Sequence, residues 1–131
     1  MAANYAERID RIVRFLNEQV ESTPSLQDLA DVAEISPYHF HRIYRAVTGE
    51  TPAGTLRRLR MARAIAMLRD TSKPVTEIAF DIGYESSQAF SKALRQMTGS
   101  SASELRRDRS KLDALAQTMA GAPQRPKSSK L

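Results

Sequence analysis

Two sets of polar side chains recur along the chain with the spacing of one helix face, at positions i, i+3, i+4 and i+7. The first set is Tyr38, His41, Arg42 and Arg45. The second set lies 50 residues later and is Gln88, Ser91, Lys92 and Arg95. Both sets consist of groups that bind base edges or phosphates, and neither contains an acidic residue. Such groups suit a helix in the major groove of duplex DNA, where Arg or Lys recognises guanine, Gln recognises adenine and an aromatic ring contacts the thymine methyl. An ordinary solvated helix face is the alternative interpretation.

The sequence gives little support for catalysis, metal binding or nucleotide binding. The chain contains no Cys, which excludes thiolate metal sites and cysteine nucleophiles. Its two histidines, His39 and His41, would point about 200° apart on a helix, which does not suit a shared metal ion. The sequence has no Ser/His/Asp arrangement and no Gly-rich phosphate-binding motif. We therefore expect neither an enzyme nor a cofactor.

The elements that carry the two sets also repeat. Residues 26–33 match 75–82 at an offset of 49, and residues 40–49 match 90–99 at an offset of 50. Each copy has the pattern of a helix-turn-helix, with a small Ala30 or Ala79 where a larger side chain would push the second helix away. Gly83 suits a positive φ angle in the second turn, where the first copy has Glu34.

Hydrophobic periodicity and capping residues predict an all-α fold of about seven helices. Gly49 and Gly99 lie just after two of the predicted helices, where a residue in the left-handed conformation commonly ends a helix. The predicted helices cover residues 5–20, 26–33, 37–48, 52–70, 75–82, 87–98 and 102 onward. We expect the second helix of each copy to bury the side opposite its polar set, through Phe40, Ile43, Tyr44 and Val47 in the first copy and Phe90, Ala93, Leu94 and Met97 in the second.

The excess of positive charge lies at one end of the chain. The 131 residues include 20 Lys and Arg against 15 Asp and Glu, a net charge of +5. Residues 1–105 hold 13 basic and 13 acidic side chains, so the excess falls in residues 106–131. We expect a tandem helix-turn-helix domain over residues 1–108, with copies at 26–49 and 75–99 and a linker helix at 52–70. Residues 109–131 are expected to form a basic, flexible tail, although the last helix could be extended by Leu105, Leu112, Leu115 and Met119.

These motifs resemble the AraC/XylS family of transcription regulators, in particular the DNA-binding domain of the MarA/SoxS/Rob type. The resemblance covers roughly residues 5–107 and is most specific at 29–42, 60–64 and 78–86. It implies base-reading positions at Tyr38, His41 and Arg42 and at Ser87, Gln88, Ser91 and Lys92. The chain departs from the family pattern at Leu94, Ala102 and Leu105, where the family commonly has Phe, Pro and an aromatic residue.

The resemblance implies a bacterial, sequence-specific regulator that activates transcription through contact with RNA polymerase. Because one chain carries both copies, we expect a monomer with two helices in adjacent major grooves, about 34–36 Å apart. A linker helix of about 19 residues spans roughly 28 Å of that distance. Two alternatives remain open: a DNA-binding fragment of a longer effector-responsive regulator with a C-terminal ligand-sensing domain, and a non-specific architectural DNA binder. The sequence lacks a run of 18 apolar residues and a signal-peptide core, so we expect no membrane partner and a cytoplasmic location.

Overall fold

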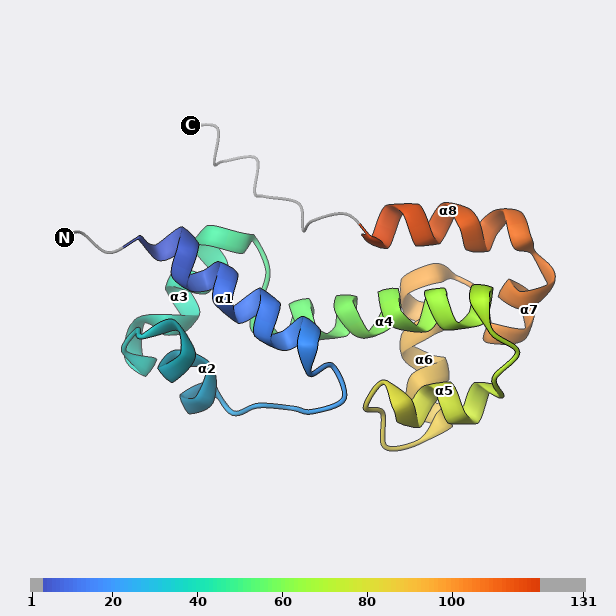
Figure 1. Cartoon of the computed structure of the whole chain (residues 1–131), viewed down its shortest axis with the longest axis horizontal. Helices are drawn as coiled ribbons and strands as arrows, with labels where there is room; N and C mark the ends of the chain where they lie inside the picture. The colour runs from blue at the N-terminus through green and yellow to red at the C-terminus, as the bar shows by residue number, and fades with distance from the viewer. Residues whose placement is uncertain (1–3, 121–131) are drawn as a thin grey trace. The chain divides into compact units, whose positions relative to one another are not determined.

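The computed structural model describes residues 4–120, and the regular structure of this part of the chain is entirely helical (Figure 1). Its eight helices are α1 (Tyr5–Glu18), α2 (Leu26–Ala33), α3 (Pro37–Thr48), α4 (Pro52–Asp70), α5 (Val75–Asp81), α6 (Ser87–Thr98), α7 (Ala102–Arg107) and α8 (Arg109–Ala120). The predicted all-α fold is confirmed. The first six helices end within two residues of their predicted bounds, and the helix predicted from residue 102 onward is divided into α7 and α8.

Local hydrogen bonds explain where two of the short helices begin. α2 and α7 each start with a capping box, in which a serine side chain accepts from the backbone N–H three residues on and an acidic side chain accepts from the serine N–H. The box of α2 pairs Ser25 with Asp28, and that of α7 pairs Ser101 with Glu104. Because the Ser101 N–H donates to its carboxylate, the pKa of Glu104 lies below its usual value.

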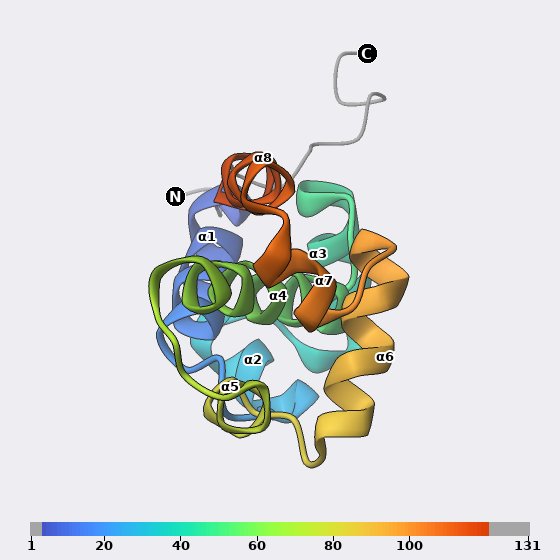
Figure 2. The same ribbon diagram turned by 90° about the vertical axis from the view of Figure 1, so that its right-hand side faces the viewer.

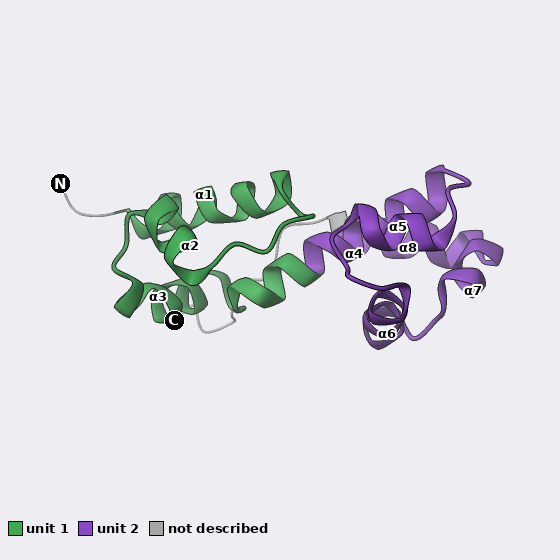
Figure 3. Ribbon diagram, turned by 90° about the horizontal axis from the view of Figure 1, so that it is seen from below, with its two compact units in different colours: residues 1–57, 122–131 green, residues 58–121 purple. Residues whose placement is uncertain are grey.

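The helices form two compact units (Figure 3). Each unit has its own buried hydrophobic side chains. The first unit holds the described residues as far as Arg57 and the second begins at Arg58, so α4 starts in one unit and ends in the other. In the first unit, α1, α2 and α3 pack against one another. Their fully buried side chains include Ile12, Phe40 and Tyr44. α1 therefore completes a core to which the repeated segment supplies only α2 and α3.

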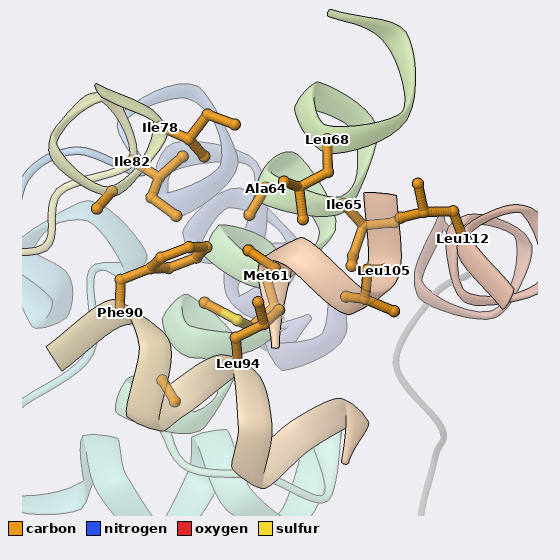
Figure 4. Close-up of a cluster of buried hydrophobic side chains, with 13 residues drawn as sticks. Met61, Ala64, Ile65, Leu68, Ile78, Ile82, Phe90, Leu94, Leu105 and Leu112 are labelled. Carbon is orange, nitrogen blue, oxygen red and sulfur yellow. The ribbon is translucent and has the colours of Figure 1, made fainter. Parts of the chain in front are cut away.

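In the second unit, α4 packs at the centre of a hydrophobic cluster that also includes residues of α5, α6, α7 and α8. Figure 4 shows Phe90 and Leu94 of α6 directed toward Met61 of α4. Leu94 and Leu105, two of the departures from the family pattern, are fully buried in this cluster. The prediction of a buried Met97 is wrong, because Met97 lies in the last turn of α6 and its side chain is exposed.

Both copies end their second helix in the same way. The Thr48 hydroxyl donates to the Tyr44 carbonyl at 2.9 Å, and the Thr98 hydroxyl donates to the Leu94 carbonyl at 2.8 Å. The glycine that follows each threonine adopts a left-handed conformation, with φ of 83° in the first copy and 78° in the second. The predicted helix terminators are therefore confirmed in both copies.

The turn between the two helices of each copy also has a common backbone. Gly83 has a φ of 100°, as predicted, and Glu34 has a φ of 57° at the matching position of the first copy. In both turns the backbone N–H of the residue that follows the one with positive φ donates to the carbonyl of the small alanine. The distance is 3.0 Å to Ala30 and 3.0 Å to Ala79. A left-handed conformation costs a non-glycine residue about 1–2 kcal/mol. The first copy therefore makes the same turn with a less suitable residue.

Residues 109–120 form α8, so the prediction of a flexible tail is wrong for this segment. Leu112 is fully buried, and Leu115 and Met119 pack against the cluster of the second unit. In both Figure 1 and Figure 2, α8 lies over the C-terminal half of α4. The apolar spacing of these three residues on one helix face accounts for the docking of α8. The rest of the predicted tail, residues 121–131, lies outside the described residues.

Replacement of Leu112 by Ala should lower the free energy of unfolding by about 2–5 kcal/mol, because it removes buried methyl groups from a packed core. Urea unfolding followed by circular dichroism measures this loss. Gln117→Ala is the matched control on the exposed side of the same helix, and it should leave the free energy of unfolding nearly unchanged. Equal stability of Leu112→Ala and the parent chain would contradict the assignment of α8 to the core.

Candidate nucleic-acid interface

Helix α3 buries one side and presents its polar set on the other. The rings of Phe40 and Tyr44, on the inner side, are fully buried. All four residues of the first polar set are exposed: Tyr38, His41, Arg42 and Arg45. Tyr38 is 88% exposed, an unusual state for a large aromatic ring. Nearly the whole ring is therefore available to a partner.

Helix α6 repeats this arrangement in the second unit. Its inner side is formed by Phe90 and Leu94, which are fully buried. All four residues of the second polar set are exposed: Gln88, Ser91, Lys92 and Arg95. Ser87, which the resemblance adds to the site, is half-buried in the first turn of α6. Each predicted set is therefore gathered on one helix, and the two sets lie in different units.

Within each helix-turn-helix pair, the basic and the acidic residues lie on different helices. α3 and α6 contain no acidic residue, whereas Asp28 and Asp31 lie on α2, and Glu77 and Asp81 lie on α5. Asp81 accepts from the Lys73 ammonium at 2.6 Å, and this hydrogen bond raises the pKa of Lys73. The outer sides of α3 and α6 thus carry only neutral polar and basic groups. Such a surface attracts a polyanion.

A buried hydroxyl pair fixes α3 to the first turns of α4. The Tyr44 hydroxyl donates to Thr55 Oγ1 at 2.6 Å, and Thr55 Oγ1 donates to Glu50 Oε1 at 2.7 Å. Tyr44 and Thr55 are both fully buried, where a polar group needs a partner. Sequence reasoning counted Tyr44 only as part of the apolar stripe. It missed the hydrogen bond because the partner is 11 residues away on another helix.

Two cationic side chains from the segment that was expected to be a flexible tail form hydrogen bonds with other residues of the second unit. Arg109 donates to the Arg69 carbonyl at the end of α4 at 2.9 Å, and Lys111 donates to Ser100 Oγ at 2.6 Å. Arg106, just before them, donates to the carbonyl of Thr71 at 3.1 Å. Cations near a helix C-terminus satisfy carbonyls that have no partner within the helix. All three side chains therefore form hydrogen bonds within the second unit.

Within residues 4–120, no group of three or more His, Asp or Glu side chains is placed to hold a metal ion. Among the helices of residues 4–120, none combines the length and the hydrophobicity that a membrane-spanning segment requires.

Comparison with known sequences places the chain among helix-turn-helix proteins. A sequence model of the helix-turn-helix domain matches residues 29–108. The regulatory protein SoxS of Escherichia coli is 29% identical over 98 residues, which cover 75% of this chain and 92% of SoxS. The HTH-type transcriptional activator RhaS of Citrobacter koseri is 32% identical over 116 residues, which cover 88% of this chain and 41% of RhaS.

Solved structures of regulators share the fold. The DNA-binding domain of the transcription factor AdpA, solved in complex with a target DNA, superposes with a TM-score of 0.70 at 27% identity, over 76% of this chain and 90% of that one. A regulator with an AraC-type DNA-binding domain from Chromobacterium violaceum gives a TM-score of 0.73 at 25% identity, over 79% of this chain and 92% of that one. Because the domain model covers most of both helix pairs, and the helices have the arrangement of these domains, the chain belongs to the AraC family of helix-turn-helix transcription regulators.

Proposed function

We propose that the chain regulates transcription by binding a specific site in duplex DNA, with α3 and α6 in adjacent major grooves. The observation that carries the proposal is the pair of exposed, acid-free polar faces on equivalent helices of the two copies. The major groove of B-DNA admits an α-helix and displays a different pattern of donors and acceptors for each base pair. Because each helix is fixed by its buried side, its outer side chains meet the DNA as a set.

On α3, Arg42 is the side chain best suited to guanine, because a guanidinium donates to O6 and N7 together. The exposed ring of Tyr38 suits apolar contact with a thymine methyl. His41 lies on the same polar face and provides a further base contact. Arg45, one turn beyond His41, suits a phosphate, which fixes the register of the helix without reading sequence.

On α6, the chemistry of the set is different. Gln88 suits the two polar edges of adenine, and Lys92 suits guanine. Ser87 and Ser91 provide short hydroxyl contacts to either bases or phosphates, and Arg95 suits a phosphate. The two copies therefore present different groups to the DNA. We expect the two halves of the binding site to differ in sequence.

We further propose that the protein activates transcription through contact with RNA polymerase. The name of RhaS, a transcriptional activator, supports the assignment as an activator. The matched segment makes up nearly all of SoxS but less than half of RhaS, and either kind of protein would read DNA with the same two helices. Since both reading helices belong to one chain, one copy per site suffices. A bacterial regulator of this kind acts in the cytoplasm, on double-stranded DNA.

Arg42→Ala should weaken binding to the preferred site by about 1–3 kcal/mol and relax the preference at one or two base pairs. Fluorescence anisotropy on the preferred duplex and on single-base variants measures both effects. Arg14→Ala is the control, because it removes the same charge from an exposed position on α1. Equal weakening on specific and random duplexes would show that Arg42 contacts only phosphate.

Selection of duplexes from a random pool by the full chain should return a non-palindromic site of about 15–20 base pairs, because two different helices each read one groove about a helical turn apart. Sedimentation of the complex should give one chain per duplex. A palindromic site that binds two chains would contradict the proposal, as would a pool without enriched sequences.

The spacing between the two halves of that site provides a second readout. Insertion of about five base pairs, half a helical turn, moves one groove to the far side of the duplex and should abolish the contribution of one helix. Insertion of a full turn keeps the groove on the same side but exceeds the reach of a continuous linker helix, so it should also weaken binding. Undiminished affinity after either insertion would overturn simultaneous reading by α3 and α6.

Truncation after residue 120 should lower the salt dependence of binding without changing the order of preferred sites. It leaves α8 intact and removes Arg125, Lys127 and Lys130. Each lost phosphate contact should reduce the slope of log K against log salt by about 0.9. A chain in which these three residues are replaced by Gln should behave like the truncated chain. A changed order of preferred sites would mean that residues 121–131 read the DNA sequence.

A further inference from the structure

Arg42 already has a hydrogen-bond partner on its own helix. Its Nη2 lies 3.1 Å from Nδ1 of His39, one turn earlier on α3. A guanidinium only donates hydrogen bonds, so Nδ1 of His39 must be the acceptor. This requires a neutral imidazole with its proton on Nε2. The contact occupies one N–H of the guanidinium and leaves the others for a partner.

The His39 ring is in turn packed against a neighbouring ring. The centroids of Tyr38 and His39 are 4.9 Å apart, with an angle of 73° between the ring planes. This edge-to-face arrangement is favourable for aromatic pairs. Tyr38, His39 and Arg42 are all exposed, and so they form a connected cluster on the surface of α3. Two members of the cluster, Tyr38 and Arg42, belong to the polar set that the proposed function assigns to DNA.

The second copy lacks this arrangement. Ala89 occupies the position that matches His39, and Lys92 occupies the position that matches Arg42. An alanine side chain accepts no hydrogen bond. Lysine is a point charge on a flexible stem, whereas arginine presents a planar fork. The two copies therefore place a cation on the same turn of the helix, but only the first copy has a side chain that orients it.

We propose that His39 is a positioning residue, which holds the Arg42 guanidinium in the orientation that discriminates guanine; this rests on the proposed function. In water, an exposed hydrogen bond of this kind contributes little. Once DNA excludes water from the cluster, the same hydrogen bond becomes stronger. His39 then restricts the orientations that the Arg42 guanidinium can adopt. This restriction favours guanine, which has two acceptors side by side. Discrimination at the half-site of α3 should accordingly be sharper than at the half-site of α6.

The test compares two replacements of His39 in the full chain. His39→Leu keeps a side chain of moderate size but removes the acceptor, whereas His39→Asn keeps an acceptor atom at the branch position of Nδ1. His39→Leu should reduce the preference for guanine at the Arg42 base pair by about 3- to 10-fold, and His39→Asn should restore most of it. In a chain that also carries Arg42→Ala, His39→Leu should have no further effect on that preference. Urea unfolding checks that the variants fold equally well.

Three results would overturn the positioning role. These are an unchanged guanine preference in His39→Leu, a loss in His39→Asn equal to that in His39→Leu, and a full effect of His39→Leu in the Arg42→Ala background. The last would mean that His39 acts on DNA by itself. A parent chain without any sequence preference would overturn the proposed function and the positioning role together. Loss of preference in Arg42→Ala alone, with His39→Leu like the parent, would overturn only the positioning role.

Discussion

Burial of one side of α3 and of α6 is the constraint on which both polar faces depend. Each helix has 12 residues, a length at which an isolated helix is marginal in water. Each is therefore fixed by packing, through Phe40 and Tyr44 in the first unit and Phe90 and Leu94 in the second. Loss of one such aromatic side chain typically costs about 3–5 kcal/mol. Without this packing, the outer side chains would share no common orientation.

The two copies share a backbone and differ in what supports it. The turn residues with positive φ and the threonine that closes each second helix recur in equivalent positions. The first copy adds the hydrogen bond between the hydroxyls of Tyr44 and Thr55. The second copy adds α8, whose Lys111 donates to Ser100 just after the end of α6. Similar exposed faces are thus held in place by different neighbours.

Features that depend on residues close together in the sequence could be predicted from it, whereas features that depend on distant residues could not. Periodicity and capping residues are local signals, and the repeat is visible from the sequence alone. Together they located six helices and both exposed sets within two residues. The roles of Tyr44, Arg109 and Lys111 depend on partners from 11 to 40 residues away, which no local pattern reveals.

Some local features also escaped prediction, because spacing does not determine side-chain position. The three-residue spacing of His39 and Arg42 places them on one helix face, but it does not show that their side chains meet. The exposure of Met97 was missed because a stripe of apolar residues does not reveal which of its members the neighbouring helices cover. For α8, the apolar spacing was visible, but the basic residues around it favoured a flexible tail.

In the proposed function, one chain reads two neighbouring grooves of the duplex through its two copies. Hydroxyl-radical footprinting of a selected site, with one chain bound per duplex, tests this mode of binding. Two protected windows should appear on one face of the DNA, with centres separated by about one helical turn of 10–10.5 base pairs. The sequences within the two windows should differ. A single protected window, or two symmetric windows that appear only when a second chain binds, would contradict it.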